Sequence, residues 1–255
     1  MQRLPDFIIG GAPRSGTTWL YELLNRHPRV YMARPSKPEP KFFLVDQIYE
    51  KGLSYYCHWF ADAAPDQLAG EKTTNYLESP VAARRIRKHL PKVKLIFILR
   101  DPVERAYSNY LWSRMNGLEH EEFLVALDLE EKREFELPDP LRFARPHAYF
   151  GRGQYSELLR PYFDLFAREQ ILCLRFEDLI EDRDALIAKL AGFLNIEPRP
   201  QDDALLGIVN PAAGSNFAMP GAARRRLAAA YVEPNRRLAR LLGHGFKIWE
   251  YDNDG

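Results

Sequence analysis

The chain has 255 residues, and its 36 Lys and Arg against 35 Asp and Glu give a formal net charge of +1. This balance gives no general reason to expect nucleic acid or a membrane surface as a partner, while 46% hydrophobic residues suffice for the core of an α/β domain. The two cysteines, Cys57 and Cys173, lie far apart and form no C-x-x-C pair, so we expect buried thiols rather than a metal or redox motif.

The first apolar run of the chain begins at Phe7. This start leaves no room for a secretory signal peptide before it, and no later apolar run is long enough to span a bilayer. We therefore expect a soluble, cytoplasmic protein with no nucleic-acid or membrane partner. Nothing in the sequence predicts the oligomeric state.

The chain is organised around a strand, a turn and a helix near its start. Residues 7–9 form an apolar run typical of a buried strand, residues 10–16 are rich in Gly, Pro and Ser, and residues 17–24 carry apolar side chains at helical spacing. Phosphate-binding loops share this layout, because glycines let the backbone approach an anion and the N–H groups at the helix start hold it. A strand–turn–helix without a ligand looks the same, so the layout alone leaves both interpretations open.

The loop differs from that of the nucleotide triphosphatases in the position of its cation. Gly11, Gly16 and Thr18 fit the spacing of G-x-x-x-x-G-K-[ST], but Thr17 occupies the lysine position. The basic residue lies within the turn instead, as Arg14. We expect the loop to bind a phosphate, with its cation near the group that is transferred.

A short strand at 30–32 is followed by a stiff, proline-rich loop over residues 34–43. Glu39 is a carboxylate between two lysines in this loop, and two aromatic residues at its end are expected to anchor it. Such a loop can place a carboxylate accurately, although a solvated loop charge is the alternative interpretation. Residues 44–66 are rich in aromatic side chains and are expected to be helical. Residues 68–72 then predict a short strand.

The clearest central strand, residues 93–99, ends in Arg100, and a helix begins near Pro102. Open α/β sheets bind ligands at the carboxyl ends of their strands, so Arg100 is a candidate anion ligand. Ser108, two helical turns further on, is expected to face the same anion. An ion pair between Arg100 and a neighbouring carboxylate is the structural alternative. A magnesium-binding aspartate ends this strand in nucleotide triphosphatases, so the arginine favours guanidinium groups over a metal.

The second half of the chain continues to alternate helices with strands and has an irregular flap at about 201–222. Helices are expected at 80–90, 119–136, 155–168, 177–194 and 223–242, with a strand at 170–175. This alternation predicts a single α/β domain over residues 1–255. Its P-loop-like fold has a mainly parallel central sheet with helices on both faces.

Two segments resemble the sulfotransferases that use 3′-phosphoadenosine 5′-phosphosulfate (PAPS). Residues 11–18, Gly-Ala-Pro-Arg-Ser-Gly-Thr-Thr, are similar to the family's loop for the 5′-phosphosulfate, and residues 99–110 are similar to its 3′-phosphate motif. Their order and spacing also match the family. Further segments, at 39–43, 70–73 and 231–235, resemble the glycan-modifying (heparan-type) branch. The amino-acid sequence of the first loop also resembles that of the tyrosylprotein sulfotransferases.

The resemblance implies in-line transfer of a sulfuryl group from PAPS to an acceptor hydroxyl or amine, without a metal, leaving adenosine 3′,5′-bisphosphate. It implies Glu39 as the general base, with Arg14 and Lys72 stabilising charge on the sulfuryl oxygens and the leaving phosphate. The acceptor is expected to be a small molecule or a glycan. The residues assigned to the cofactor site are Pro13, Arg14, Ser15, Gly16, Thr17, Thr18, Arg100, Ser108, Tyr155, Ser215 and Asn216.

The chain departs from the family in the flap, where residues 214–220 lack the family's Lys-Gly-Arg element and Arg224 or Arg225 could substitute. Two other functions stay open. An ATP-dependent P-loop kinase or phosphotransferase is disfavoured by the missing lysine and aspartate. A non-catalytic nucleotide- or glycan-binding module would use the basic helix at 84–88. Aromatic residues between 49 and 60 and the loop 138–150 are candidates for lining the acceptor cleft, but none identifies a sugar, phenol, lipid, peptide or polyketide.

Overall fold

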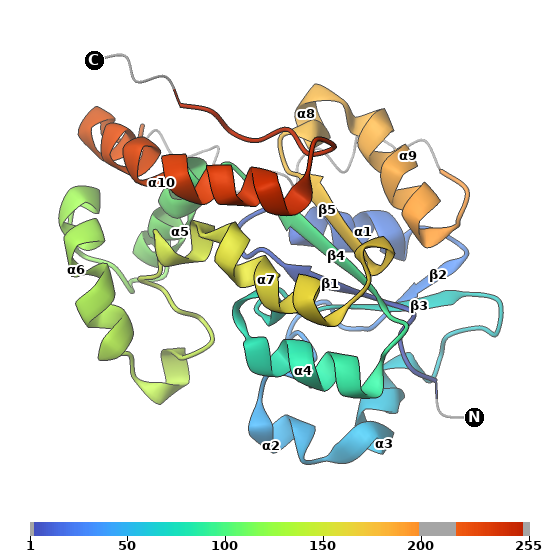
Figure 1. The fold of residues 1–255 in the computed structure, drawn as a ribbon. Helices are drawn as coiled ribbons and strands as arrows, with labels where there is room; N and C mark the ends of the chain where they lie inside the picture. Colours follow the sequence, from blue (N-terminus) through green and yellow to red (C-terminus); the bar gives the residue numbers. More distant parts are fainter. Residues whose placement is uncertain (1–2, 199–217, 252–255) are drawn as a thin grey trace. The chain divides into compact units, whose positions relative to one another are not determined.

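The structure of the chain is a computed structural model that describes residues 3–198 and 218–251 (Figure 1). The chain divides into two compact units. The sheet unit comprises residues 1–99 and 159–209, and the helical unit comprises residues 100–158 and 210–255. Each unit has a hydrophobic core of its own. The expectation of one domain over residues 1–255 stays a prediction.

The sheet unit is built on five parallel strands in the order β2-β3-β1-β4-β5. This arrangement confirms the α/β fold with a parallel central sheet. The central strands read as continuous apolar runs because they are buried on both faces. The strands are β1 (Phe7–Gly11), β2 (Val30–Met32), β3 (Leu68–Lys72), β4 (Lys94–Leu99) and β5 (Ile171–Arg175).

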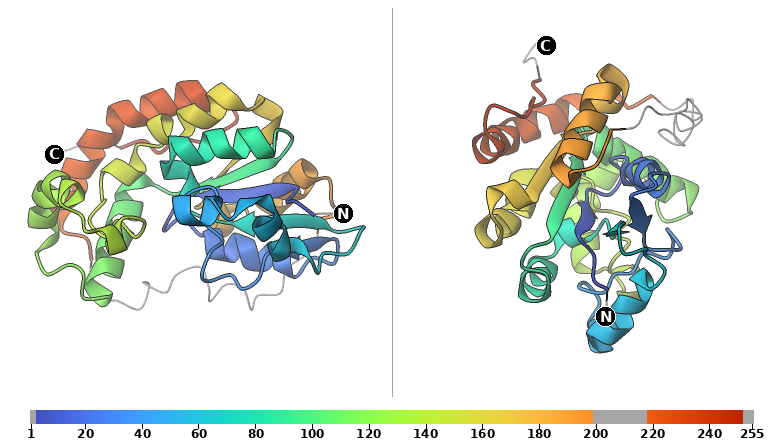
Figure 2. Two further views of the ribbon diagram at one scale, coloured as in Figure 1. Left: turned by 90° about the horizontal axis from the view of Figure 1, so that it is seen from below. Right: turned by 90° about the vertical axis from the view of Figure 1, so that its right-hand side faces the viewer.

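Helices cover both faces of this sheet, as predicted (Figure 2). Ile96 and Ile98 of β4 point into the core cluster that α1 and α9 complete. Phe97, between them, points to the opposite face, where its ring packs edge-on against Tyr162 of α7 at 4.9 Å between centroids. The helices with residues in this unit are α1 (Thr17–Asn25), α2 (Asp46–Tyr49), α3 (Gly52–Cys57), α4 (Pro80–His89), α7 (Tyr155–Leu165), α8 (Asp178–Glu181) and α9 (Arg183–Leu194).

Two helical predictions need correction. Residues 44–66 form only the short helices α2 and α3 and a 3₁₀ turn at His58–Phe60. The first residue of α3, Gly52, has φ +77°, so α3 does not continue the helix of α2. The helix predicted over 177–194 is broken at Asp182, whose carboxylate accepts a hydrogen bond from Ala185 N at 3.2 Å and so starts α9 anew.

The chain order of the strands places a topological switch between β1 and β4. The strand that follows β1 in the chain lies on one side of the sheet, and the strand that follows β4 lies on the other. Ala12, the first residue after β1, donates its N–H to Ile98 O at 2.9 Å. The loop after β1 therefore starts at the position where open α/β sheets form a ligand-binding crevice.

The helical unit is built from α5 (Pro102–Met115), α6 (Phe123–Phe135), the first turn of α7 and α10 (Gly221–Leu242). Its core is rich in aromatic side chains, including Tyr110, Phe123 and Tyr231. Among the described residues, no helix is long and apolar enough to cross a membrane.

Gly70 of β3 provides a test of packing in the sheet. A Cβ atom at Gly70 would lie 2.2 Å from Cζ of its register partner Phe7, so Gly70→Ala should destabilise the sheet unit by about 2 kcal/mol or more. The matched control is Gly192→Ala in α9, where nothing lies within 4 Å of the new Cβ. That change should instead stabilise by about 0.5–1 kcal/mol. Urea denaturation measures both, and equal effects of the two substitutions would contradict the register of β1 and β3.

Candidate active site

The turn after β1 leads into α1 through Gly16, which has φ +88°. A Cβ atom there would lie 2.8 Å from Cδ2 of Phe176. Both the left-handed backbone and the close packing therefore require glycine at this position. Arg14, within the same turn, also has a positive φ of 67°. The turn thus has a defined and unusual backbone conformation.

The start of α1 is suited to an anion. No side chain caps the helix, and its first turn contains no acidic residue. Of the longer helices in the same unit, α4 and α9 are capped by Ser79 and Asp182, whereas the short helices α2, α3 and α8 have no side-chain cap. Ser15, fully buried just before α1, has a hydroxyl with no hydrogen-bond partner in the described structure. Donors at an uncapped helix start bond to water or to a ligand, and the helix dipole favours an anion there.

Glu39 and Lys72 form a buried ion pair beside this turn. Lys72 Nζ donates to Glu39 Oε1 at 2.5 Å, and the two side chains are only 2% and 12% exposed. Thr74 holds the other carboxylate oxygen, donating from its N–H at 3.1 Å and from its hydroxyl at 3.2 Å. The alternative interpretation of Glu39 as a solvated loop charge is therefore wrong. Its carboxylate is held by three donors from the end of β3 and the residues after it.

The proline-rich loop that carries Glu39 is anchored by the aromatic residues at its end. Phe42 and Phe43 are almost completely buried, and Phe42 stacks on Tyr56 of α3 at 4.5 Å between ring centroids. Phe43 N donates to the Tyr76 hydroxyl at 3.2 Å. Tyr56 of α3 therefore belongs to the packing behind Glu39. The predicted contact of the aromatic residues between 49 and 60 with an acceptor is not tested.

A second buried carboxylate, Glu71, lies behind the ion pair on the opposite face of β3. Tyr56 donates its hydroxyl to Glu71 at 2.6 Å, and Thr73 donates its hydroxyl at 3.1 Å. The Thr73 hydroxyl also accepts the N–H of Lys41 at 3.2 Å, which ties the Glu39 loop to β3. Complete burial raises the pKa of Glu71 to about 7, although these hydrogen bonds act in the opposite direction.

Sheet register brings the ion pair to the same edge as the turn after β1. Lys72 is the register partner of Ile9, and Thr73 N donates to Ile9 O at 3.1 Å. The carboxyl ends of β1 and β3 are therefore adjacent. Within the sheet unit, the structure brings together the predicted anion loop, Glu39 and Lys72.

The remaining predicted site residues belong to the helical unit. Arg100 directly follows β4 in the chain, and Ser108 lies buried on α5. Tyr155, at the start of α7, donates its hydroxyl to Arg100 O at 2.8 Å. Ser215 and Asn216, with most of the flap, lie outside the described residues. The cofactor roles assigned to all these residues stay predictions.

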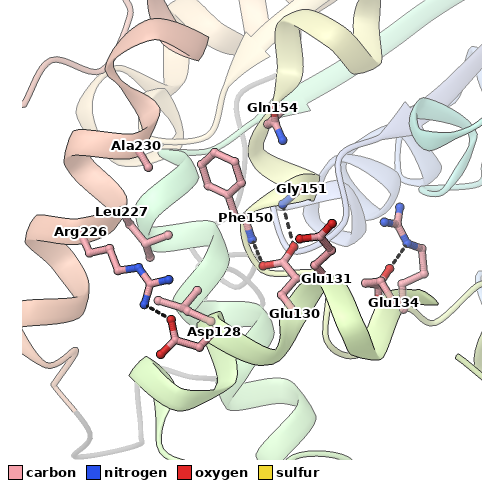
Figure 3. Close-up of a pocket in the computed structure, with 12 residues that line it drawn as sticks. Asp128, Glu130, Glu131, Glu134, Phe150, Gly151, Gln154, Arg226, Leu227 and Ala230 are labelled. Carbon is pink, nitrogen blue, oxygen red and sulfur yellow. Dashed lines mark hydrogen bonds and ion pairs between the residues drawn. The ribbon is translucent and has the colours of Figure 1, made fainter. Parts of the chain in front are cut away.

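The helical unit also contains a pocket of about 620 Å³ lined by α6, α10 and residues 145–154 (Figure 3). Glu130 points into it and accepts the N–H groups of Phe150 and Gly151 at 2.7 and 2.8 Å. Two ion pairs in the pocket wall join Arg226 to Asp128 and Arg145 to Glu134, both at 2.6 Å. These carboxylates bind groups of the protein itself. A role of the loop 138–150 in acceptor binding is not tested.

Comparison with known proteins identifies the family. The model of the family described as "Sulfotransferase domain" matches residues 4–210. The chain is 30% identical over 205 residues to the human bifunctional heparan sulfate N-deacetylase/N-sulfotransferase 2, covering 77% of this chain and 22% of that protein. It is 27% identical over 269 residues to the membrane-associated sulfotransferase kil1 of Dictyostelium discoideum, covering 76% of this chain and 56% of the relative. The chain thus spans about half or less of these relatives.

A solved sulfotransferase from Alicyclobacillus acidocaldarius superposes with a TM-score of 0.79 and 25% identity, covering 94% of this chain and 96% of that one. The fold is that of an α/β protein with a parallel sheet and a strand–turn–helix at the switch point of that sheet. The chain belongs to the sulfotransferase family, which confirms the family resemblance found in the sequence. Among the described residues, no group of three or more His, Cys, Asp or Glu could hold a metal ion, and the expectation of a metal-free reaction stays a prediction.

Sequence reasoning missed Thr74 and gave Glu71 no role. Thr74 is the second residue after β3, and its position near the carboxyl end of a strand was the available signal. Glu71 is a charged residue within a predicted buried strand, which also signals a specific partner. The partners themselves, Glu39 for Thr74 and Tyr56 for Glu71, come from distant segments.

The raised pKa of Glu71 predicts how stability depends on pH. The folded state keeps this proton up to about pH 7, whereas the unfolded state releases it near pH 4.5, so stability should fall as pH rises through this window. The free energy of unfolding of Glu71→Gln, compared with that of wild type, should therefore rise by up to about 3 kcal/mol between pH 4.5 and pH 8. Urea denaturation at both pH values measures the difference. Parallel pH profiles for the two proteins would refute the assignment.

Proposed function

We propose that this chain transfers the sulfuryl group of PAPS to a hydroxyl or amine of an acceptor, with Glu39 as the general base. The observation that carries the proposal is the buried Glu39–Lys72 pair at the same sheet edge as an uncapped helix start. Family membership supplies the reaction class. The fit to a phosphosulfate rests on the N–H groups at the start of α1 and on the Ser15 hydroxyl, which is buried without a partner in the described structure.

PAPS would supply the sulfuryl group, and the chain's own residues would position and stabilise it. The N–H groups of residues 14–18, with the hydroxyls of Thr17 and Thr18, would bind the 5′-phosphate. Glu39 would accept the proton of the acceptor while the acceptor atom bonds to sulfur and the bond from sulfur to the bridging oxygen breaks. Lys72 and Arg14 would stabilise the negative charge on the sulfuryl oxygens and on the leaving phosphate.

The contacts of Glu39 suit this role. Three donors fix the carboxylate, so it need not reorganise when the acceptor arrives. Its 12% exposure leaves part of the side chain accessible. Lys72 lies against the base, so the positive charge that stabilises the leaving group also balances the carboxylate before reaction.

We propose that Arg100 and Ser108 bind the 3′-phosphate, as the resemblance of residues 99–110 implies, and thereby select PAPS over ATP. An arginine suits this task because its planar guanidinium can bind a phosphate through two parallel hydrogen bonds.

The acceptor is proposed only by chemical class. One relative is named for N-sulfotransfer on heparan sulfate, so an amine or hydroxyl of a glycan is one candidate, alongside a small molecule. The cytoplasmic location expected from the sequence stays a prediction.

Replacement of the base tests the mechanism. Glu39→Gln should lower kcat by at least about 10²–10⁴-fold, because the amide cannot accept the proton, while the nucleotide still binds. Sulfate transfer is followed by mass gain over an acceptor panel, and nucleotide binding by calorimetry. The control is Glu50→Gln, a change of the same kind at an exposed site. Normal turnover by Glu39→Gln would remove this residue from the mechanism.

Removal of the Arg100 side chain, which is proposed to bind the 3′-phosphate, tests nucleotide selection. Arg100→Ala should raise the Kd of adenosine 3′,5′-bisphosphate by roughly 10- to 100-fold, because a charge-assisted hydrogen bond contributes about 1.5–3 kcal/mol. Adenosine 5′-phosphate should be almost unaffected. Arg84→Ala, on the exposed face of α4, is the control. Tighter binding of ATP–Mg than of the bisphosphate by the wild type would instead favour the kinase alternative.

A further inference from the structure

The turn that carries Arg100 is held by two tyrosines that approach it from different segments of the helical unit. Tyr155 at the start of α7 donates its hydroxyl to the carbonyl oxygen of Arg100 at 2.8 Å. Tyr251, in the segment that follows α10, donates its hydroxyl to Asp101 Oδ1 at 2.9 Å. The two hydrogen bonds hold consecutive residues of the same turn, one through the main chain and one through a side chain.

Asp101 connects this turn to the helix behind it. The oxygen that accepts from Tyr251 also accepts the N–H groups of Val103 and Glu104, at 2.8 and 3.4 Å, and so caps α5. An acidic cap also interacts favourably with the positive end of the helix dipole. Tyr251 therefore bonds to the group that fixes where α5 begins, and α5 carries Ser108.

The segment that carries Tyr251 is itself packed in place. Asn235 of α10, which is buried, donates its side-chain amide to Trp249 O at 2.8 Å. The Trp249 ring is buried and lies 6.1 Å from the ring of Tyr155 and 5.7 Å from that of Phe246, between centroids. The two tyrosines are therefore joined through Trp249, and both reach the Arg100 turn from a packed base.

From this geometry we infer that Tyr155 and Tyr251 are positioning residues that aim Arg100 and the start of α5 at the 3′-phosphate of the nucleotide. The inference rests on the proposed binding of that phosphate by Arg100 and Ser108. A guanidinium on a short turn can reorient with its backbone, so an arginine discriminates well only when the backbone beneath it is fixed. On this inference, Tyr155 acts by holding the Arg100 carbonyl and not by direct contact with the nucleotide.

The test compares two nucleotides that differ only in the 3′-phosphate. Tyr251→Phe and Tyr155→Phe keep the ring and remove one hydrogen bond each. Calorimetry gives the Kd of adenosine 5′-phosphate divided by that of adenosine 3′,5′-bisphosphate. This ratio should fall roughly two- to tenfold in each variant, the range expected for one hydrogen bond. A loss of fold stability alone would weaken the binding of both nucleotides equally and leave the ratio unchanged. The Tm of each variant is therefore measured as well.

The matched control is Tyr110→Phe on α5. The Tyr110 hydroxyl donates to a main-chain oxygen, Glu121 O, at 3.0 Å, away from the Arg100 turn. The ratio should not change in this variant. An unchanged ratio in both Tyr251→Phe and Tyr155→Phe, with a collapsed ratio in Arg100→Ala, overturns the positioning role alone. An unchanged ratio in Arg100→Ala overturns the 3′-phosphate assignment and the inference with it.

Discussion

The buried ion pair between Glu39 and Lys72 is the constraint on which the sheet unit's site depends. Withdrawing a carboxylate and an ammonium group from water costs several kcal/mol each, and their attraction offsets this only when the geometry is good and the remaining hydrogen bonds are made. Here the contact is 2.5 Å, and Thr74 supplies two further donors. Removing either partner would leave the other charge buried and uncompensated. The pair can therefore exist only if the loop and the strand that carry it are held rigidly together.

The sheet register, the buried aromatic residues and the hydrogen bonds of Thr73 together provide that rigidity. The register of β3 against β1 places Lys72 opposite Ile9, close to the turn after β1. The buried aromatic residues that end the Glu39 loop fix its far side, and the Thr73 hydroxyl bonds both to Glu71 and to the main chain of Lys41. Glu71 thus acts as an internal acceptor behind the site. Its burial is unfavourable for the ionised form, yet the hydroxyls that it binds are the groups that connect the loop to the strand.

Most of the fold, but only part of the site, was predictable from the sequence. Strands β1, β4 and β5 could be found because each is a mainly apolar run. The turn after β1 could be found because glycine is required at Gly16 both by φ and by packing. The break at Asp182 was missed because apolar residues continue at helical spacing on both sides, so that only the cap reveals it. The partners of Glu39 and Glu71 were not predictable, since hydrogen bonds between distant segments leave no periodic pattern in the sequence.

In the helical unit, too, a sequence motif identifies Arg100 but says nothing of what fixes it. A motif describes the residues that meet a ligand, whereas their aim depends on the backbone beneath them, and that backbone is held by residues from elsewhere in the chain. Tyr251 lies 150 positions from its partner Asp101. A side-chain hydroxyl so distant in sequence can restrict the Arg100 turn only because Trp249 and Asn235 first fix the segment that carries it. The backbone of the Arg100 turn is therefore held by two tyrosine hydroxyls and by aromatic packing from elsewhere in the helical unit.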